Sequence, residues 1–319
     1  MEADARFRAM GSDVHVIVVG APLSLLDAAR ERIERLEGLW SRFRPTSEVS
    51  RLNALAGVPV RVSPETLALV ERALEGARVT GGRYDPTVLG AMLRAGYDRS
   101  FELLGDGDTS QASALRLGYE GVAVDRDAST VTIPAGVGFD PGGIGKGFAA
   151  DLLVRDLLEA GAAGACANVG GDLRVEGEPP DGMAWTIAIE HPLRPDATEL
   201  IGLSSGAVAT STRARRVWGP PERRRHHLID PATGRPAESG MLSATVIAAE
   251  AWQAEVLAKA AFVAGVSEGL FILASRGTDG VLIDDHGTVF PTAGLERFLR
   301  VDARSSQTPA RAASGGQGR

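Results

Sequence analysis

The sequence has almost no cysteine: Cys166 is the single thiol in 319 residues. One cysteine excludes an internal disulfide and a zinc site built from several cysteines. It lies in the apolar run Ala165-Cys166-Ala167, where a buried structural thiol is favoured over a nucleophile.

Excess positive charge and long apolar runs are also missing. The formal net charge of −7 argues against a nucleic-acid-binding protein, because such proteins are usually basic. No N-terminal stretch has the charged-then-apolar pattern of a signal peptide, and no apolar run is long enough to cross a bilayer. We therefore expect a cytoplasmic globular protein with no membrane insertion and no nucleic-acid partner.

Glycine is plentiful, and it gathers in the stretch Asp140-Pro141-Gly142-Gly143-Ile144-Gly145-Lys146-Gly147. An extended apolar piece precedes this stretch and a helical pattern follows it. Glycines let backbone N–H groups approach an anion, and a helix N-terminus adds favourable partial charge. The stretch therefore suits a phosphate or pyrophosphate, with Lys146 as the cation, although a plain strand-to-helix turn is the alternative. It matches neither the P-loop nor the dinucleotide-binding pattern, which disfavours both folds.

Hydrophobic periodicity predicts helices and strands without strict βαβ alternation, which favours an α+β fold over a doubly wound sheet. No linker interrupts residues 1–301, which we expect to form one domain, and 302–319 has the composition of a disordered tail. Residues 40–53 read as a polar connector, and Gly105-Asp106-Gly107-Asp108 as an exposed loop rather than a calcium site. The expected strands are 14–19, 121–124, 131–133, 165–169, 173–175, 185–190, 206–212, 243–248 and 280–283; the expected helices are 23–39, 64–80, 147–160, 251–263 and 269–274.

Polar residues gather at three further places. His226 and His227 end a basic run, 213–225, and the hydroxyl residues Thr210-Ser211-Thr212 precede it. Glu255 and Lys259 lie four residues apart and so share a helix face. Each group also has a simpler interpretation. The two histidines fit a loop whose imidazoles bond nearby carbonyls, and the basic run fits a solvated loop. Glu255 and Lys259 fit a surface ion pair worth a few tenths of a kcal/mol.

The order of the motifs along the chain resembles the ApbE family, the FAD:protein FMN transferases. The resemblance covers nearly everything from Met10 to Leu299. Its motifs are Met10-Gly11-Ser12, Trp40-Ser41-Arg42-Phe43 with Ser50-Arg51-Leu52-Asn53, Gly82-Arg83-Tyr84-Asp85-Pro86-Thr87, the glycine-lysine stretch with Asp151, Asn168-Val169-Gly170-Gly171-Asp172, Ala209-Thr210-Ser211 and His227-Leu228-Ile229-Asp230-Pro231-Ala232-Thr233-Gly234-Arg235-Pro236.

The resemblance implies a bilobal α+β unit, related to the T-fold, that binds FAD in a cleft between its lobes. Such enzymes cut the FAD pyrophosphate, release AMP, and attach FMN through a phosphoester to a threonine or serine of an acceptor flavoprotein, usually with magnesium. Lys146 would offset developing charge, and His227 is our candidate for handling the acceptor hydroxyl proton, because imidazole titrates near neutral pH. The implied FAD contacts are Met10, Phe43, Arg83, Tyr84, Asp85, Asp140, Lys146, Ile229 and Ala258.

The chain departs from the family pattern at the implied magnesium site. The matching positions are the Gly143 carbonyl, Glu255 and Lys259, and a protonated lysine has no lone pair with which to ligate a cation. Lys259 would then either supply positive charge to the pyrophosphate or mark a protein that has lost transfer activity and only binds a flavin. The sequence thus predicts a transferase with an altered metal requirement; the alternatives are a non-catalytic FAD-binding protein and an FAD pyrophosphatase that releases FMN and AMP.

Overall fold

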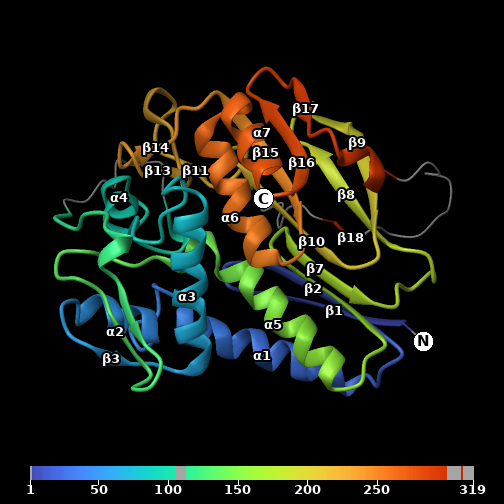
Figure 1. The fold of residues 1–319 in the computed structure, drawn as a ribbon, viewed down its shortest axis with the longest axis horizontal. Coiled ribbons are helices and arrows are strands. Elements are labelled where there is room, and N and C mark those ends of the chain that lie inside the picture. Colours follow the sequence, from blue (N-terminus) through green and yellow to red (C-terminus); the bar gives the residue numbers. More distant parts are fainter. Residues whose placement is uncertain (1, 105–112, 300–309, 312–319) are drawn as a thin grey trace.

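An antiparallel sheet, eight-stranded within the described residues, runs through the molecule (Figure 1). The computed structural model describes residues 2–104, 113–299 and 310–311. Each neighbouring pair in the sheet is antiparallel, which confirms the α+β class and excludes a doubly wound arrangement. In spatial order the strands are β1 (Glu2–Ala9), β2 (Ser12–Val19), β6 (Gly164–Val169), β7 (Asp172–Gly177), β10 (Gly206–Thr212), β15 (Met241–Ala248), β16 (Asp279–Asp284) and β17 (Val289–Pro291).

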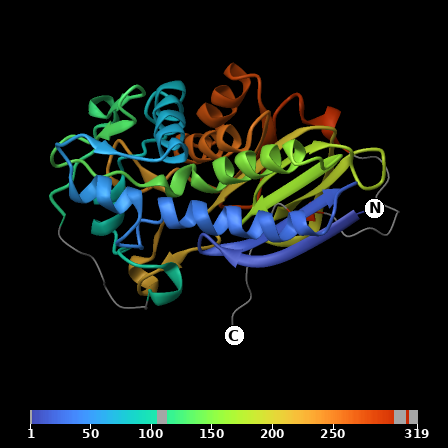
Figure 2. The same ribbon diagram turned by 90° about the horizontal axis from the view of Figure 1, so that it is seen from below.

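Both faces of this sheet are covered. Helices pack along one face, as Figure 2 shows for α1 and α5. The hairpin β8 (Trp185–His191) and β9 (Arg194–Leu203) packs its apolar side chains on the other face. This double cover explains why every residue of β6 and β15 is buried, without the alternation typical of a half-exposed strand. The helices are α1 (Ser24–Trp40), α5 (Gly145–Glu159), α6 (Ala251–Ala264) and α7 (Val266–Ser275).

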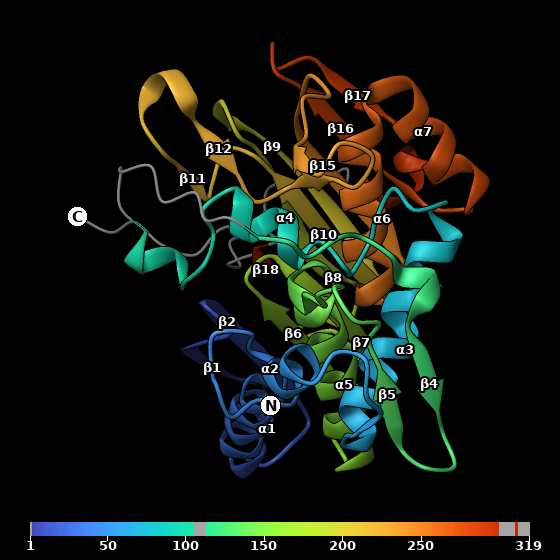
Figure 3. The same ribbon diagram turned by 90° about the vertical axis from the view of Figure 1, so that its left-hand side faces the viewer.

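A second group of elements lies beside one end of the sheet and carries the loops that face α5 and α6 (Figures 1 and 3). In it, the ribbon β11–β12 contacts the end of α4, where the Trp218 indole donates to the Ala95 carbonyl at 2.8 Å. Its helices are α2 (Glu48–Ala54), α3 (Pro64–Val79) and α4 (Leu89–Arg94); its strands are β3 (Val60–Arg61), β4 (Ala123–Asp125), β5 (Thr130–Thr132), β11 (Val217–Trp218), β12 (Arg225–His226), β13 (Ile229–Asp230) and β14 (Arg235–Pro236). The short 3₁₀ turns are 101–103, 119–121, 141–143, 221–223 and 295–298.

Most of the expected elements are present within a few residues of their predicted bounds. The predicted cap of α3 is confirmed, since the Ser63 hydroxyl accepts from the Thr66 N–H at 3.3 Å. Cys166 is fully buried, and burial raises the pKa of its thiol to about 12. The thiol is therefore structural, as the sequence indicates.

Three expectations need correction or comment. Residues 40–53 are not simply a connector, because Ser47 caps α2, which buries Val49 and Leu52. Sequence analysis missed β1 and β9, whose outer positions are largely exposed and polar. The predicted loop 105–108 lies outside the described residues, as does the predicted tail 302–319 except for β18 (Ala310–Arg311), which pairs with β8.

None of the helices in the described part of the chain is both long and apolar enough to cross a bilayer.

A carboxylate on α5 caps a different helix, α6. The local N-cap residue of α6, Glu250, makes no capping hydrogen bond. Instead, the two Asp151 oxygens accept from the N–H groups of Ala251 at 2.8 Å and Trp252 at 2.9 Å. Two of the four unsatisfied donors of the helix end are thereby paired, and α5 is tied to the start of α6.

We predict that Asp151→Ala lowers the free energy of unfolding by about 1–2 kcal/mol, the usual cost of losing an N-cap acceptor. Urea denaturation followed by circular dichroism would measure it. Asp27→Ala, at an exposed position in the first turn of α1, is the matched control and should change stability by less than about 0.5 kcal/mol. Equal effects of the two substitutions would contradict the capping role.

Candidate functional site

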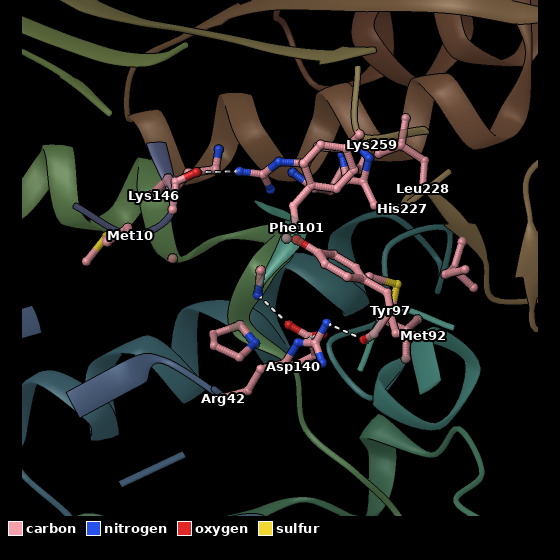
Figure 4. A pocket seen from close by; sticks show the side chains of 18 of the residues that line it. Met10, Arg42, Met92, Tyr97, Phe101, Asp140, Lys146, His227, Leu228 and Lys259 are labelled. Carbon is pink, nitrogen blue, oxygen red and sulfur yellow. Dashed lines mark hydrogen bonds and ion pairs between the residues drawn. The ribbon is translucent and has the colours of Figure 1, made fainter. Parts of the chain in front are cut away.

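A cavity lies where the second group of elements faces the start of α5 and the middle of α6. Eleven residues singled out from the sequence line it: Met10, Phe43, Arg83, Tyr84, Asp85, Asp140, Gly143, Lys146, His227, Ile229 and Lys259. Figure 4 shows Lys146, Lys259 and His227 along one side of the cavity, and Arg42 and Asp140 along another. Segments far apart in the sequence thus converge on one space. Glu255 and Ala258 do not line it, because both are buried on α6 behind Lys259.

The glycine stretch forms a 3₁₀ turn that leads into α5. Asp140 caps this turn by accepting from the Gly142 N–H at 2.8 Å, and its other oxygen lies 3.1 Å from Arg42 Nε. A Cβ on Gly143 would lie 2.6 Å from a ring carbon of Tyr84, and one on Gly147 would lie 2.4 Å from the Ala251 carbonyl oxygen. At these two positions glycine is required by close packing, a reason that the sequence pattern alone did not show.

Four charged side chains meet at the base of the cavity: Lys146, Asp172, Glu255 and Lys259. Lys146 Nζ donates to Asp172 Oδ2 and lies 3.5 Å from Glu255 Oε1. Lys259 Nζ donates to that same Glu255 oxygen at 3.0 Å, while Glu255 Oε2 accepts from the Gly147 N–H at 2.8 Å. The carboxylates are 1–2% exposed and the lysines 17%. The alternative of a surface ion pair between Glu255 and Lys259 is therefore wrong.

The pKa shifts follow from this arrangement. Burial would raise the pKa of Glu255, but Lys146, Lys259 and the Gly147 N–H outweigh it and lower that pKa to about 2. Burial and the adjacent Glu255 charge raise the pKa of Asp172 to about 6, although Lys146 opposes them. Burial opposes the charge on Lys146, yet Asp172 and Glu255 raise its pKa above the ordinary value. Glu255 is thus a permanent anion between two cations.

The residues at the implied metal positions do not fit magnesium. Lys259 offers donors only, and both oxygens of Glu255 are already engaged by N–H groups. Magnesium needs near-octahedral oxygen ligands, and the described residues contain no group of three or more His, Cys, Asp or Glu side chains arranged to hold a metal ion. The positive charge at this point of the site is carried by the ammonium groups of Lys146 and Lys259.

Two side chains that line the cavity each have a polar atom that is buried without a hydrogen-bond partner in the described residues: Tyr84 Oη and His227 Nδ1. Burial raises the pKa of Tyr84 well above its ordinary value, so the phenol stays protonated. Burial, Arg216 and Lys259 hold the pKa of His227 well below 6.5. The expectation that this imidazole titrates near neutral pH is therefore wrong: it is neutral and a weaker base than a free histidine. His226 differs, since its Nε2 lies 3.1 Å from the Ala237 carbonyl oxygen, as the carbonyl-bonded alternative expected.

Aromatic rings and an arginine form the opposite wall. The Arg42 guanidinium lies 4.1 Å from the Phe43 ring centroid and 4.8 Å from that of Tyr97. Tyr97 in turn packs against Trp218, with the ring centroids 5.3 Å apart. Sequence analysis missed Tyr97 as a site residue, because it lies outside the motifs and only the fold brings it here.

The basic run 213–225 also reaches the cavity. Arg216 lines it, has a left-handed φ of 50°, and donates to the Gly11 carbonyl at 3.2 Å. Met10 directly precedes Gly11 in the turn between β1 and β2, and it also has a left-handed φ, of 52°. Backbone strain of this kind is concentrated at functional sites. Arg213 and Arg215 instead pair with Asp285 and Glu190 on the sheet side.

Two predicted contacts are largely occupied within the protein. Asp85 Oδ1 accepts from the Thr87 N–H at 2.7 Å and from its hydroxyl at 2.6 Å, which stabilises a turn. Arg83 pairs with Glu268 at 2.7 Å, and both side chains are exposed. Either residue can still shape the cavity wall, but the Asp85 carboxylate is engaged by Thr87 and the Arg83 charge is paired with Glu268.

Comparison with known proteins gives a consistent result. A profile described as the ApbE family matches residues 10–282. The FAD:protein FMN transferase of Treponema pallidum is 30% identical over 309 residues, covering 89% of this chain and 84% of that protein. The enzyme of the same name from Vibrio cholerae is 28% identical, covering 84% and 82%. The crystal structure of the ApbE protein of Thermotoga maritima superposes with a TM-score of 0.85 at 29% identity, covering 94% of this chain and all of that one.

We predict that the imidazole of His227 stays neutral as the pH falls through 6.5 and protonates only well below it. Lys259→Met removes one of the positive charges that oppose protonation, so the pKa of His227 should rise. Titration of the ring nitrogens by ¹⁵N NMR would measure both values. Arg276→Met, at an exposed position beyond α7, is the control and should leave the titration unchanged. An unaltered pKa in the Lys259 variant would contradict the electrostatic explanation.

Proposed function

The chain belongs to the ApbE family, and from this membership we propose that it is an FAD:protein FMN transferase. The reaction would break the pyrophosphate of FAD, release AMP, and join FMN through a phosphoester to a threonine or serine of an acceptor flavoprotein. Its relatives in Treponema pallidum and Vibrio cholerae carry this activity in their names and match most of the chain.

One observation supports this proposal above the others: the cavity combines an aromatic wall with a floor of two ammonium groups. The wall formed by Phe43 and Tyr97 suits a flat ring system. The floor of Lys146 and Lys259 suits a pyrophosphate. FAD contains both groups in one molecule.

The predicted FAD contacts are part of this proposal. Met10, Phe43, Arg83, Tyr84, Asp85, Asp140, Lys146 and Ile229 are supported by their common place on the cavity wall. Ala258 is fully buried on α6 and does not line the cavity, so its contact with FAD stays a prediction. The predicted cytoplasmic location and the threonine or serine acceptor rest on sequence reasoning alone.

In the proposed step, the acceptor hydroxyl oxygen attacks the phosphorus on the riboflavin side of the pyrophosphate. The bond from that phosphorus to the bridging oxygen breaks, and AMP leaves with the bonding electrons. His227 would take the hydroxyl proton, because it lines the cavity and its imidazole is neutral. Lys146, Lys259 and Arg216 would offset the charge that develops on the phosphoryl oxygens. No step is assigned to magnesium, because the donor set does not fit it.

We predict that His227→Gln lowers FMN transfer by about 10²–10⁴-fold, the usual contribution of a general base, and changes FAD affinity only slightly. Purified protein would be incubated with FAD and a flavoprotein fragment that contains a threonine acceptor. Mass spectrometry would detect covalent FMN, chromatography would quantify AMP, and flavin fluorescence would give the Kd for FAD. His286→Gln, with a side chain 87% exposed, is the matched control.

The same experiment separates the alternative functions. AMP release without an acceptor, and without covalent FMN when one is present, would indicate an FAD pyrophosphatase. Bound FAD that is neither cleaved nor transferred would indicate a non-catalytic flavin-binding protein. Full activity of the His227 variant would remove the residue from the mechanism.

A further inference from the structure

Lysine is rare in this chain, and its distribution is informative. Lys146 and Lys259 are the only lysines among 34 basic residues; all the others are arginine. The peripheral ion pairs use arginine, as in the pairs with Glu37, Glu75 and Glu268. Both lysines lie at one place, within 3.5 Å of the same Glu255 oxygen. The basic residues of this chain are therefore arginines everywhere except beside Glu255, where both are lysines.

An ammonium and a guanidinium would fill this position differently. Lysine is a compact point charge with three donors, whereas the guanidinium of arginine is a wide planar fork. The Lys259 stem passes beneath the glycine turn, and its Cδ would lie 3.3 Å from a Cβ on Gly143. Among the described residues, Glu255 is the one carboxylate within 4 Å of Lys259 Nζ. The other N–H donors of Lys259 can therefore bind a ligand.

The charges of the cluster are also arranged for an anion. Lys146 and Lys259 together carry two positive charges, the same as one divalent cation. Asp172 and Glu255 hold them in position and balance them when the cavity contains no anion. The carboxylates lie behind the lysines, since both lysines line the cavity and neither carboxylate does. A pyrophosphate entering the cavity would therefore meet ammonium groups first.

We propose that Lys146 and Lys259 form a metal-independent site for the pyrophosphate of a dinucleotide, in which the two ammonium groups replace a divalent cation. This inference rests on the proposed function for the identity of the dinucleotide as FAD. Arg216 adds a third positive charge from the opposite loop. Because these side chains hold positive charge at fixed positions, the pyrophosphate can bind without a metal ion.

The first test measures binding rather than turnover. Flavin fluorescence would give the Kd for FAD and for riboflavin, which lacks phosphate, in EDTA and in millimolar magnesium. We expect the FAD Kd to differ by less than about threefold between the two conditions. Lys259→Met should weaken FAD binding by about tenfold or more, while riboflavin binding stays unchanged. Arg276→Met, at an exposed position, is the charge-matched control.

The second test uses the unaltered protein, and so does not depend on the folding of a variant. Because there are only two lysines, acetylation by an amine-reactive ester can be quantified at each one by peptide mass spectrometry. FAD in EDTA should protect both lysines, and riboflavin should protect neither. The α-amino group of the purified chain serves as an internal measure of reagent activity.

The outcomes distinguish this inference from the proposed function. FAD binding and lysine protection that appear only with magnesium would overturn the metal-independent site while the transferase proposal stands. Failure to bind FAD in either condition would overturn the proposed function itself. Binding in EDTA that is equal for wild type and Lys259→Met would assign the pyrophosphate to other residues.

Discussion

The site depends on one buried carboxylate, that of Glu255. Its oxygens accept from the Gly147 N–H at the start of α5 and from Lys259 on α6, and Lys146 lies 3.5 Å away. An unpaired charge at 1% exposure would be strongly destabilising. The two helices must therefore hold the positions that keep Glu255 paired, and these same positions bring both ammonium groups to the cavity.

Close packing supports this arrangement without adding charge. Gly147 lets α5 approach the first residue of α6, where any side chain would meet the Ala251 carbonyl. Asp151, one turn further along α5, caps the same end of α6. Contacts of this kind fix the relative position of two elements to a fraction of an ångström, which is the precision that phosphoryl transfer requires. The contacts that stabilise the packing of α5 against α6 therefore also fix the geometry of the site.

Family membership and the particular residues answer different questions. The likeness to ApbE proteins defines the class of reaction and the fold. The balance of charge in this chain, with Lys259 at a position where the sequence resemblance implied an oxygen ligand, would determine how a pyrophosphate is neutralised. An ammonium differs from a metal ion in that it is covalently part of the chain and cannot dissociate from the site. A site of this design is assembled when the chain folds.

The sequence by itself determined the main helices and strands, the α+β class and the family, because hydrophobic periodicity, capping residues and motif order are local or sequential properties. It also named eleven of the residues that line the cavity. Only the tertiary structure decided that Glu255 and Lys259 are buried, that Gly143 and Gly147 are needed for packing, and that Arg42, Tyr97 and Arg216 belong to the site. The physical reason is distance along the chain: Glu255 bonds a backbone group 108 residues away, and the burial of a charge depends on neighbours that only the fold supplies.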